Sequence, residues 1–388
     1  MSTKIIVLYS VLGFLLFSCK EKVKITGNPI EIALKSENTA IKRVIDSLDK
    51  YEVQIKYTQI NRTKDGIIFA DYDFQNNPNQ YFYPASSVKF LVAVLTLEKL
   101  NSMKGFTMHT KFYIEGDTLE TTVANEVSKL FAVSDNDAYN RLFEFLGQGE
   151  INQQIRSKGI KNVRISHRVS TPNSDDITTN AIVFYKNDST TQIREKIVSK
   201  PIKPLQLDRL QKGKAYFEDN ILIEEPFDFS LKNYYAINAQ HEVLKRVIFP
   251  QNFSKEQQFN LTQEQRDYLL KAMHALPAAI GYDKKEYYDS YVKFFMFGDT
   301  KEPMPKNIEI YNKVGYAYGT LTDCAYIKDT ENNVDFFLTA TILVNNNQIF
   351  NDNVYDYDTV GIPFLAALGQ EIYQQELLQK NKIRLNKL

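Results

Sequence analysis

The chain has 388 residues, of which 43% are hydrophobic and 24% charged, a balance typical of a globular protein with a sizeable core. Lysine plus arginine equal aspartate plus glutamate at 47 each, so the composition does not indicate a nucleic-acid partner. The 4 histidines stand far apart without ligand-like spacing, so we expect no metal site and no cofactor.

The first 18 residues are predicted to be a secretory signal. Lys4 precedes an apolar run over residues 5–17, which is too short to span a bilayer. The run leads into LFSC, which resembles a bacterial lipobox and implies that Cys19 is lipidated. Residues 19–35 would then be a tether, and the protein a membrane-anchored lipoprotein of the cell envelope, at the periplasm or cell surface. A plain cleaved signal and an uncleaved anchor are the alternatives.

Hydrophobic periodicity predicts an amphipathic helix over residues 39–50, followed by strands over 51–60 and 67–72. Strand-like pieces and turn residues alternate between about 180 and 235. The C-terminal part predicts three strands with short turns, at 308–315, 322–329 and 334–344. The remaining predicted helices span 86–100, 120–147 with a break at Ser-Asp-Asn-Asp, 148–159, 239–249, 262–275 and 357–379.

Strands near both ends, with helices between them, imply a discontinuous α+β domain over residues 36–388. We expect a five-stranded antiparallel sheet flanked by the N- and C-terminal helices, formed by residues 36–75 and 305–388. Residues 76–304 would form an all-helical subdomain with an insertion at about 180–235, which either roofs the active site or covers helical surface. Cys324, without a partner if Cys19 is lipidated, is expected to be a small core residue.

The helix that starts at Ser86 is apolar on almost every side, yet it carries Lys89 in its first turn. This spacing places a lysine amine on the same helix face as a serine hydroxyl. Burial lowers the pKa of a lysine, so a neutral amine there could accept the serine proton. The alternative is a lysine that extends from a core helix to solvent. The same spacing recurs, without the start of a buried helix, at Ser47/Lys50 and Ser290/Lys293.

Two further motifs follow in the chain, Ser-Asp-Asn at 134–136 and Lys-Val-Gly at 313–315. In this order the three motifs resemble those of the serine β-lactamase and penicillin-binding protein superfamily. The resemblance extends over about residues 38–376 and is greatest to the class A β-lactamases, in a variant branch that carries an insertion. It implies an acyl-serine mechanism on a β-lactamase/transpeptidase-like fold.

The resemblance also implies a role for each motif residue. Ser86 would be the nucleophile and Lys89 its general base. Ser134 would relay a proton to the leaving group, close to Lys313. Asn136 would hold a substrate amide together with Lys89.

Further residues would form the oxyanion hole and the substrate strand site. The resemblance places backbone N–H groups of Ser86 and Tyr316 in the oxyanion hole and lets the substrate lie along the strand at Gly315. Val314 replaces the threonine of the family motif, and Leu321 replaces a basic residue that often follows. Because both family residues receive a substrate carboxylate, we expect a substrate without that carboxylate or a different receptor for it.

The loop after Ser-Asp-Asn also departs from the class A pattern. No glutamate occurs between residues 151 and 194, whereas class A enzymes use a glutamate there to activate the deacylating water. Asp175, Asp176 and His167 are the candidates to replace it, or simply loop residues.

These features predict a monomeric serine hydrolase of class A β-lactamase type, acting on a small-molecule β-lactam or a peptidoglycan-like substrate. A DD-peptidase-, amidase- or esterase-like envelope enzyme is one alternative. A lipoprotein that binds or senses β-lactams without turnover is another. A Ser-His-Asp hydrolase is not indicated, because G-x-S-x-G is missing and the histidines are scattered.

Overall fold

The computed structural model describes residues 27–385, so the signal segment and Cys19 lie outside the described residues. Its centre is an antiparallel sheet of 5 strands in the order β13-β14-β15-β1-β2. The sheet joins the two ends of the chain, because β1 pairs with β15 and places Lys56 opposite Thr339. Its strands are β1 (Gln54–Thr63), β2 (Gly66–Phe74), β13 (Ile308–Ala317), β14 (Thr320–Asp329) and β15 (Val334–Leu343).

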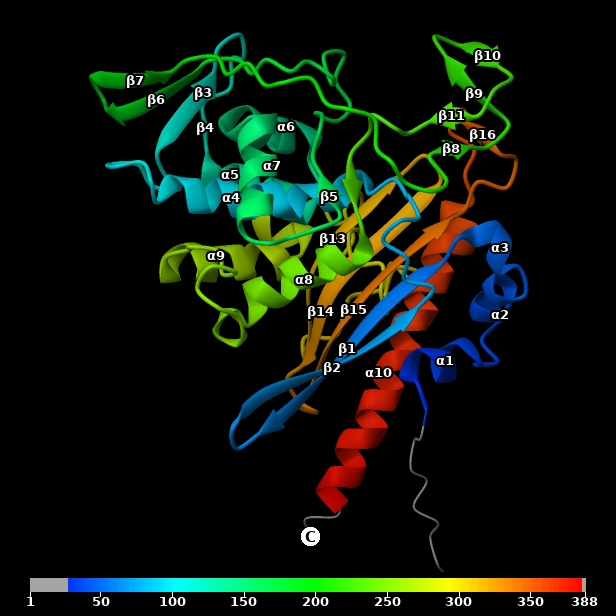
Figure 1. Ribbon diagram of the computed structural model, residues 1–388. Coiled ribbons are helices and arrows are strands. Elements are labelled where there is room, and N and C mark those ends of the chain that lie inside the picture. Colours follow the sequence, from blue (N-terminus) through cyan, green and yellow to red (C-terminus); the bar gives the residue numbers. More distant parts are fainter. Residues whose placement is uncertain (1–26, 386–388) are drawn as a thin grey trace, which may run out of the picture.

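Helices cover both faces of the sheet (Figure 1). The long C-terminal helix α10 (Ile362–Leu385) crosses one face beside the short N-terminal helices. Helices α8 (Ile237–Ile248) and α9 (Gln263–His274) pack on the opposite face. The predicted α+β class, with a five-stranded sheet between terminal and internal helices, is confirmed.

The N-terminal segment corrects the predicted tether. Residues 29–34, which belong to the predicted tether, form helix α1 (Pro29–Leu34), which packs against α10. The Asn28 side chain caps the helix, and Pro29 occupies its first turn. Ile30 and Ala33 are fully buried, so the fold begins before residue 36. Two further short helices follow, α2 (Thr39–Ile45) and α3 (Leu48–Tyr51).

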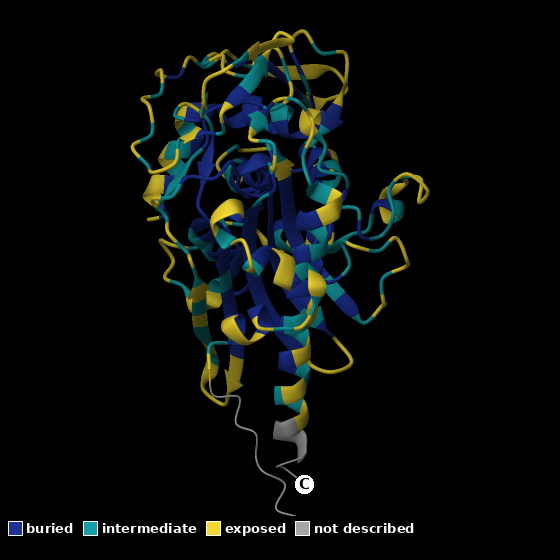
Figure 2. Cartoon of the chain, turned by 90° about the vertical axis from the view of Figure 1, so that its right-hand side faces the viewer, coloured by how far each residue is buried: buried dark blue, intermediate teal, exposed yellow. Residues whose placement is uncertain are grey.

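The other half of the molecule surrounds α4 (Val88–Leu100), which is buried along nearly its whole length. The burial colouring of Figure 2 shows buried residues along the middle of the molecule and exposed residues around it. Because α4 is buried on all sides, its sequence needs no polar face. The helices around it are α5 (Val123–Ala132), α6 (Asn136–Leu146) and α7 (Gln148–Ser157).

The sequence predicted that this half would be all helical. That prediction is wrong. A sheet of 4 strands in the order β4-β3-β6-β7 lies beside the helices. Smaller sheets occupy the predicted insertion, and β9 (Ala215–Glu218) there pairs with β16 (Ile349–Phe350) from the C-terminal part. The other short strands are β3 (Lys111–Ile114), β4 (Thr121–Thr122), β5 (Val163–Arg164), β6 (Ile182–Asn187), β7 (Thr190–Arg194), β8 (Gln211–Lys212), β10 (Ile221–Ile223), β11 (Phe227–Asp228) and β12 (Tyr234–Tyr235).

Short helical turns complete the structure. They are η1 (Ala85–Ser87), η2 (Pro250–Asn252), η3 (Pro277–Ile280) and the π-helical η4 (Tyr357–Gly361). Within residues 27–385, none of the helices combines the length and the apolar character needed to cross a membrane.

Candidate active site

Ser86 lies at the junction between the turn η1 and the helix α4. Ala85, just before it, has a φ of 46°, in the left-handed region that non-glycine residues rarely adopt. The turn is fixed by Ser87, whose hydroxyl donates to the carbonyl of Pro84 at 2.8 Å. Such backbone strain is often found at functional sites. The junction presents the Ser86 side chain to a cavity of about 540 Å³.

Lys89, one turn further along α4, is fully buried. Its amine donates to Asn136 Oδ1 at 2.6 Å, to the backbone carbonyl of Ser134, and to Ser134 Oγ at 3.4 Å. Burial lowers the pKa of Lys89 to about 7, against the opposing effect of nearby carboxylates. The Ser-x-x-Lys and Ser-Asp-Asn motifs therefore meet, and the lowered pKa gives Lys89 a neutral fraction near neutral pH.

Lys313 reaches the same serine from the sheet. Its amine donates to Ser134 Oγ at 2.7 Å and to the carbonyl of Val314 at 2.8 Å. Burial and the neighbouring Lys89 amine hold the pKa of Lys313 well below its usual range. Ser134 itself has a φ of 57°. The hydroxyl of Ser134 is thus within hydrogen-bond reach of two buried lysine amines, an arrangement suited to passing a proton.

Gly315 allows strand β13 to approach the nucleophile. A Cβ atom at this position would lie 2.6 Å from the carbonyl oxygen of Pro84 and 2.8 Å from the backbone N of Ser86. Any side chain would therefore push the strand away from the η1 turn. Gly315 lies next to Tyr316, which is 52% exposed and lines the cavity.

Not every predicted substrate-binding residue faces the cavity. Val314 is 1% exposed and packs in the core around α10, and Leu321 is fully buried there too. Neither is among the lining residues, and among these no lysine or arginine occurs. The two positions at which the resemblance implied a carboxylate receptor are therefore uncharged and buried away from the cavity.

The cavity has a wall of tyrosines that the sequence did not reveal. They come from segments far apart in the chain, so only folding brings them together. Two pairs among them lie close in the sequence, Tyr287 with Tyr291 and Tyr316 with Tyr318. The tyrosines that line the cavity are Tyr83, Tyr287, Tyr291, Tyr316 and Tyr318.

The three residues that could replace the missing glutamate do not line this cavity. His167 is buried, its Nε2 accepts from the backbone N of Asn233 at 3.2 Å, and burial lowers its pKa to about 4. Asp175 lines a different cavity, and Asp176 is exposed. Of the lining residues, only Asp135 carries a carboxylate, and its Oδ1 caps α6 by accepting from the backbone N of Ala138 at 2.7 Å.

The other two Ser-x-x-Lys pairs do not form similar sites. Ser47 precedes the short surface helix α3. Lys293 is buried, but its amine donates to the carbonyl of Met273 and to Asn312 Oδ1, while Ser290 donates to the carbonyl of Thr300. Within residues 27–385, no group of three or more His, Cys, Asp or Glu side chains could hold a metal ion.

Comparisons with known proteins agree with this geometry. The model of the beta-lactamase enzyme family matches residues 36–375. A β-lactamase from Desulfarculus baarsii has a TM-score of 0.52 and 13% identity, over 88% of this chain and 96% of that one. A class A β-lactamase from Mycobacterium abscessus has a TM-score of 0.50 and 15% identity, over 87% of this chain and 98% of that one. None of the curated proteins matches this chain.

The structural likeness at these identities concerns the fold, whereas the family model covers most of the sequence. Both agree with a cavity lined by Ser86 and Ser134, where the Lys89 amine lies 3.4 Å from Ser134 Oγ. The chain therefore belongs to the beta-lactamase enzyme family and is a serine-β-lactamase-like hydrolase.

Proposed function

We propose that the protein opens a β-lactam ring, or a related amide, through an ester formed on Ser86. The observation that carries the proposal is the Ser134 hydroxyl, 3.4 Å from the Lys89 amine and 2.7 Å from the Lys313 amine. Neutral Lys89 takes the proton of Ser86 while the serine oxygen attacks the carbonyl carbon. Ser134 then gives its proton to the leaving nitrogen as the carbon–nitrogen bond breaks, and it is reprotonated from Lys89.

The oxygen of the attacked carbonyl becomes negative in this step and needs hydrogen-bond donors. We assign that role to the backbone N–H groups of Ser86 and Tyr316. The close approach of β13 to the η1 turn, which Gly315 permits, supports this assignment.

Hydrolysis of the ester is expected to be slow. Water needs a base close to the ester carbonyl, and the only carboxylate that lines the cavity, Asp135, already caps a helix. This observation favours a second candidate function, a penicillin-binding or sensing protein in which the acyl group remains on Ser86.

The buried positions of Val314 and Leu321 favour a further candidate, an envelope peptidase, amidase or esterase. Neither side chain can offer a carboxylate receptor in the cavity. A natural substrate without a carboxylate at that place would need no such receptor.

The test of acylation is labelling with a fluorescent penicillin, compared among the wild type, Ser86→Ala and Lys89→Met. We expect no label on Ser86→Ala, and about 10²–10⁴-fold slower labelling of Lys89→Met, because a general base contributes that much. The matched control is Ser47→Ala, which should label like the wild type. Labelling of Ser86→Ala would show that another residue is the nucleophile.

A further inference from the structure

The structure buries a third lysine, Lys293, in the segment that precedes β13. Its amine donates to the carbonyl of Met273 at 2.8 Å and to Asn312 Oδ1 at 2.7 Å. Met273 lies in the last turn of α9, where the helix dipole favours a cation. Both acceptors and the helix end therefore suit an ammonium group, although burial lowers the pKa of Lys293 to about 7.

A buried carboxylate lies at the other end of the same hydrogen-bond chain. The side-chain amide of Asn312 donates to Asp323 Oδ1 at 2.8 Å, so it connects Lys293 with Asp323. Asp323 Oδ2 accepts from the backbone N of Phe294 at 3.1 Å and of Phe295 at 3.3 Å. Burial raises the pKa of Asp323 to about 6, whereas these three N–H donors favour the ionised carboxylate. We call Lys293, Asn312 and Asp323 the Lys-Asn-Asp bridge.

The Lys-Asn-Asp bridge joins the outermost strand of the sheet to the segment before it. β13 has a neighbour in the sheet on one side only, which is β14. Asn312 lies on β13 and also donates to the carbonyl of Val292 at 2.9 Å. The residue after Asn312 is Lys313, and Asp323 on β14 is the register partner of Val314. The bridge therefore fixes β13 at the residues that bring Lys313 to the catalytic cavity.

The charged and titratable groups around Lys313 come from α4, from β14 and from the segment before β13. Burial lowers the pKa of Lys313 most, and the cations Lys89 and Lys293 add to this effect, whereas the carboxylate of Asp323 opposes it. Cys324, the register partner of Lys313, is buried, and burial raises the pKa of its thiol, so it is neutral. The two charges of the bridge thus act on Lys313 in opposite directions.

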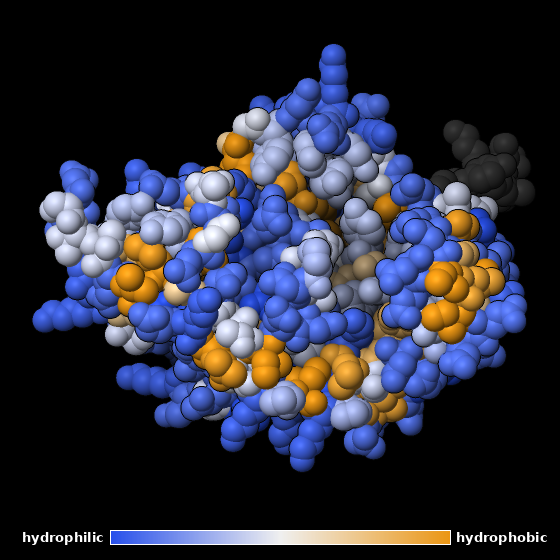
Figure 3. All heavy atoms as spheres, turned by 90° about the horizontal axis from the view of Figure 1, so that it is seen from above, coloured by the Kyte–Doolittle hydropathy of each residue, from blue (hydrophilic) through white to orange (hydrophobic). Residues whose placement is uncertain are grey.

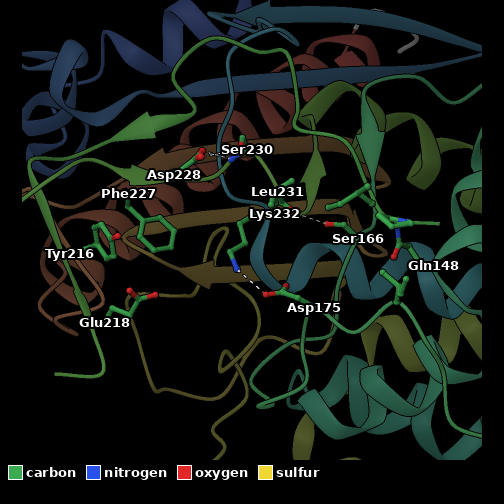
Figure 4. Close-up of a pocket in the computed structure, with 13 residues that line it drawn as sticks. Gln148, Ser166, Asp175, Tyr216, Glu218, Phe227, Asp228, Ser230, Leu231 and Lys232 are labelled. Atoms are coloured by element: carbon green, nitrogen blue, oxygen red, sulfur yellow. Dashed lines mark hydrogen bonds and ion pairs between the residues drawn. The ribbon is translucent and has the colours of Figure 1, made fainter. Parts of the chain in front are cut away.

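Charges at the surface of this protein are screened far more strongly. Figure 3 shows hydrophilic side chains over most of the face seen from above, where water solvates them. In Figure 4, Lys232 points toward Asp175 beside the cavity at the insertion, 3.8 Å away, and the two side chains are 24% and 69% exposed. Water and salt screen such a pair. Lys293 and Asp323 are almost fully buried, so their charges act on Lys313 with less screening.

We propose that Lys293 and Asp323 are positioning residues for Lys313 in the proposed reaction. Through Asn312 they hold the Lys313 amine beside Ser134 and balance opposite charges around it. The proposal rests on the function proposed above, because it is the proton transfer through Ser134 that Lys313 assists. Removing the anion of the bridge should weaken the hold of Lys313 on its proton, and removing the cation should strengthen it.

The test is a titration of Lys313 that does not depend on acylation. The full-length protein in detergent, with ¹³C at the Cε atoms of its lysines, is followed by NMR between pH 4 and 11. The signal of Lys313 is the one missing from Lys313→Met. Asp323→Asn should lower the pKa of Lys313 by about 0.5–1 pH unit, and Lys293→Met should raise it by about the same amount.

Three further variants separate charge from structure. The double variant Lys293→Met with Asp323→Asn keeps the net charge of the bridge, so its Lys313 should titrate close to the wild type. Ser290→Ala removes a hydrogen bond of a buried residue in the same segment without changing any charge. Lys232→Met removes a partly exposed cation. Neither of the last two should move the pKa of Lys313.

The sign of each shift decides the outcome. An unchanged pKa of Lys313 in either folded single variant, shifts of the same sign in both, or an equal shift in Ser290→Ala would overturn the proposal. Circular dichroism checks folding, and if one single variant unfolds, the other still decides because it has its own expected sign. Penicillin labelling of the wild type is independent of this titration and tests the proposed function alone.

Discussion

At the scale of single residues, the hydroxyl of Ser134 connects the two lysine amines of the site. It lies within hydrogen-bond reach of Lys89 and Lys313, whose burial disfavours their charged forms. Two ammonium groups beside each other would repel, which further lowers the pKa of Lys313. The site thus has a base that is partly neutral at neutral pH.

The first prediction concerns the pH dependence of acylation. With a pKa of about 7, Lys89 is mostly protonated below that pH and mostly neutral above it. The rate of Ser86 acylation should therefore rise about tenfold per pH unit below 7 and level off above it. Stopped-flow acylation by a penicillin between pH 5 and 9 measures this profile. A rate that is flat or falls over the same interval would remove Lys89 from the role of base.

The second prediction concerns Gly315. Because a Cβ atom there would lie 2.8 Å from the backbone N of Ser86, Gly315→Ala should displace the nucleophile and slow acylation about 100-fold. Gly149→Ala is the control, since its Cβ atom would meet only Ser199 Oγ at an ordinary 3.7 Å. Acylation of Gly315→Ala at the wild-type rate would mean that the strand does not position Ser86.

At the scale of elements, the loop between β5 and β6 depends on one buried arginine. Arg168 is 2% exposed, and its guanidinium donates to Glu144 and to the backbone carbonyls of Asp176 and Thr178 at 2.8 Å. The next residues, Val169 and Ser170, line the catalytic cavity. The arginine therefore couples the conformation of the loop to the shape of the site.

The third prediction concerns the pair formed by Arg168 and Glu144. Arg168→Met leaves the carboxylate of Glu144 buried without its cation, which should lower the free energy of unfolding by about 3–5 kcal/mol. Urea denaturation measures the loss, and Arg156→Met, at an exposed position, should change it little. Equal stability of the two variants would show that the pair does not hold the loop.

Elements with a strong local pattern could be predicted from the sequence, including the sheet strands and the buried helix of Ser86. The motifs also identified Lys89 and Ser134, because their chemistry needs fixed residue types. Helix α1 was missed, although Asn28 and Pro29 give the cap signals of a helix start. The tyrosine wall could not be predicted as a whole, since it forms only when distant segments meet.

At the scale of the whole molecule, the described fold begins at α1, which packs against α10. We propose that a lipid on Cys19, outside the described residues, anchors the protein to a membrane of the cell envelope. The fold itself would then lie in water beside that membrane.

The fourth prediction tests the anchor. Cys19→Ser should move the full-length protein from the membrane fraction to the soluble fraction and abolish labelling by a clickable fatty acid, because a thioether-linked lipid needs the thiol. Cys324→Ser is the control: Cys324 is buried and accepts a hydrogen bond from Thr339, so its loss should not change fractionation. Membrane retention and labelling of Cys19→Ser would contradict the lipid anchor.

The central claim is that Ser86 forms a covalent acyl-enzyme, and intact-protein mass spectrometry tests it most directly. The domain from residue 27 onward is mixed with a penicillin and sampled from seconds to hours. We predict one added penicillin mass per chain, located on Ser86 by peptide mapping and persisting because the cavity offers no free carboxylate base. A domain that gains no mass and leaves the penicillin intact, or an adduct retained by Ser86→Ala, would contradict the account.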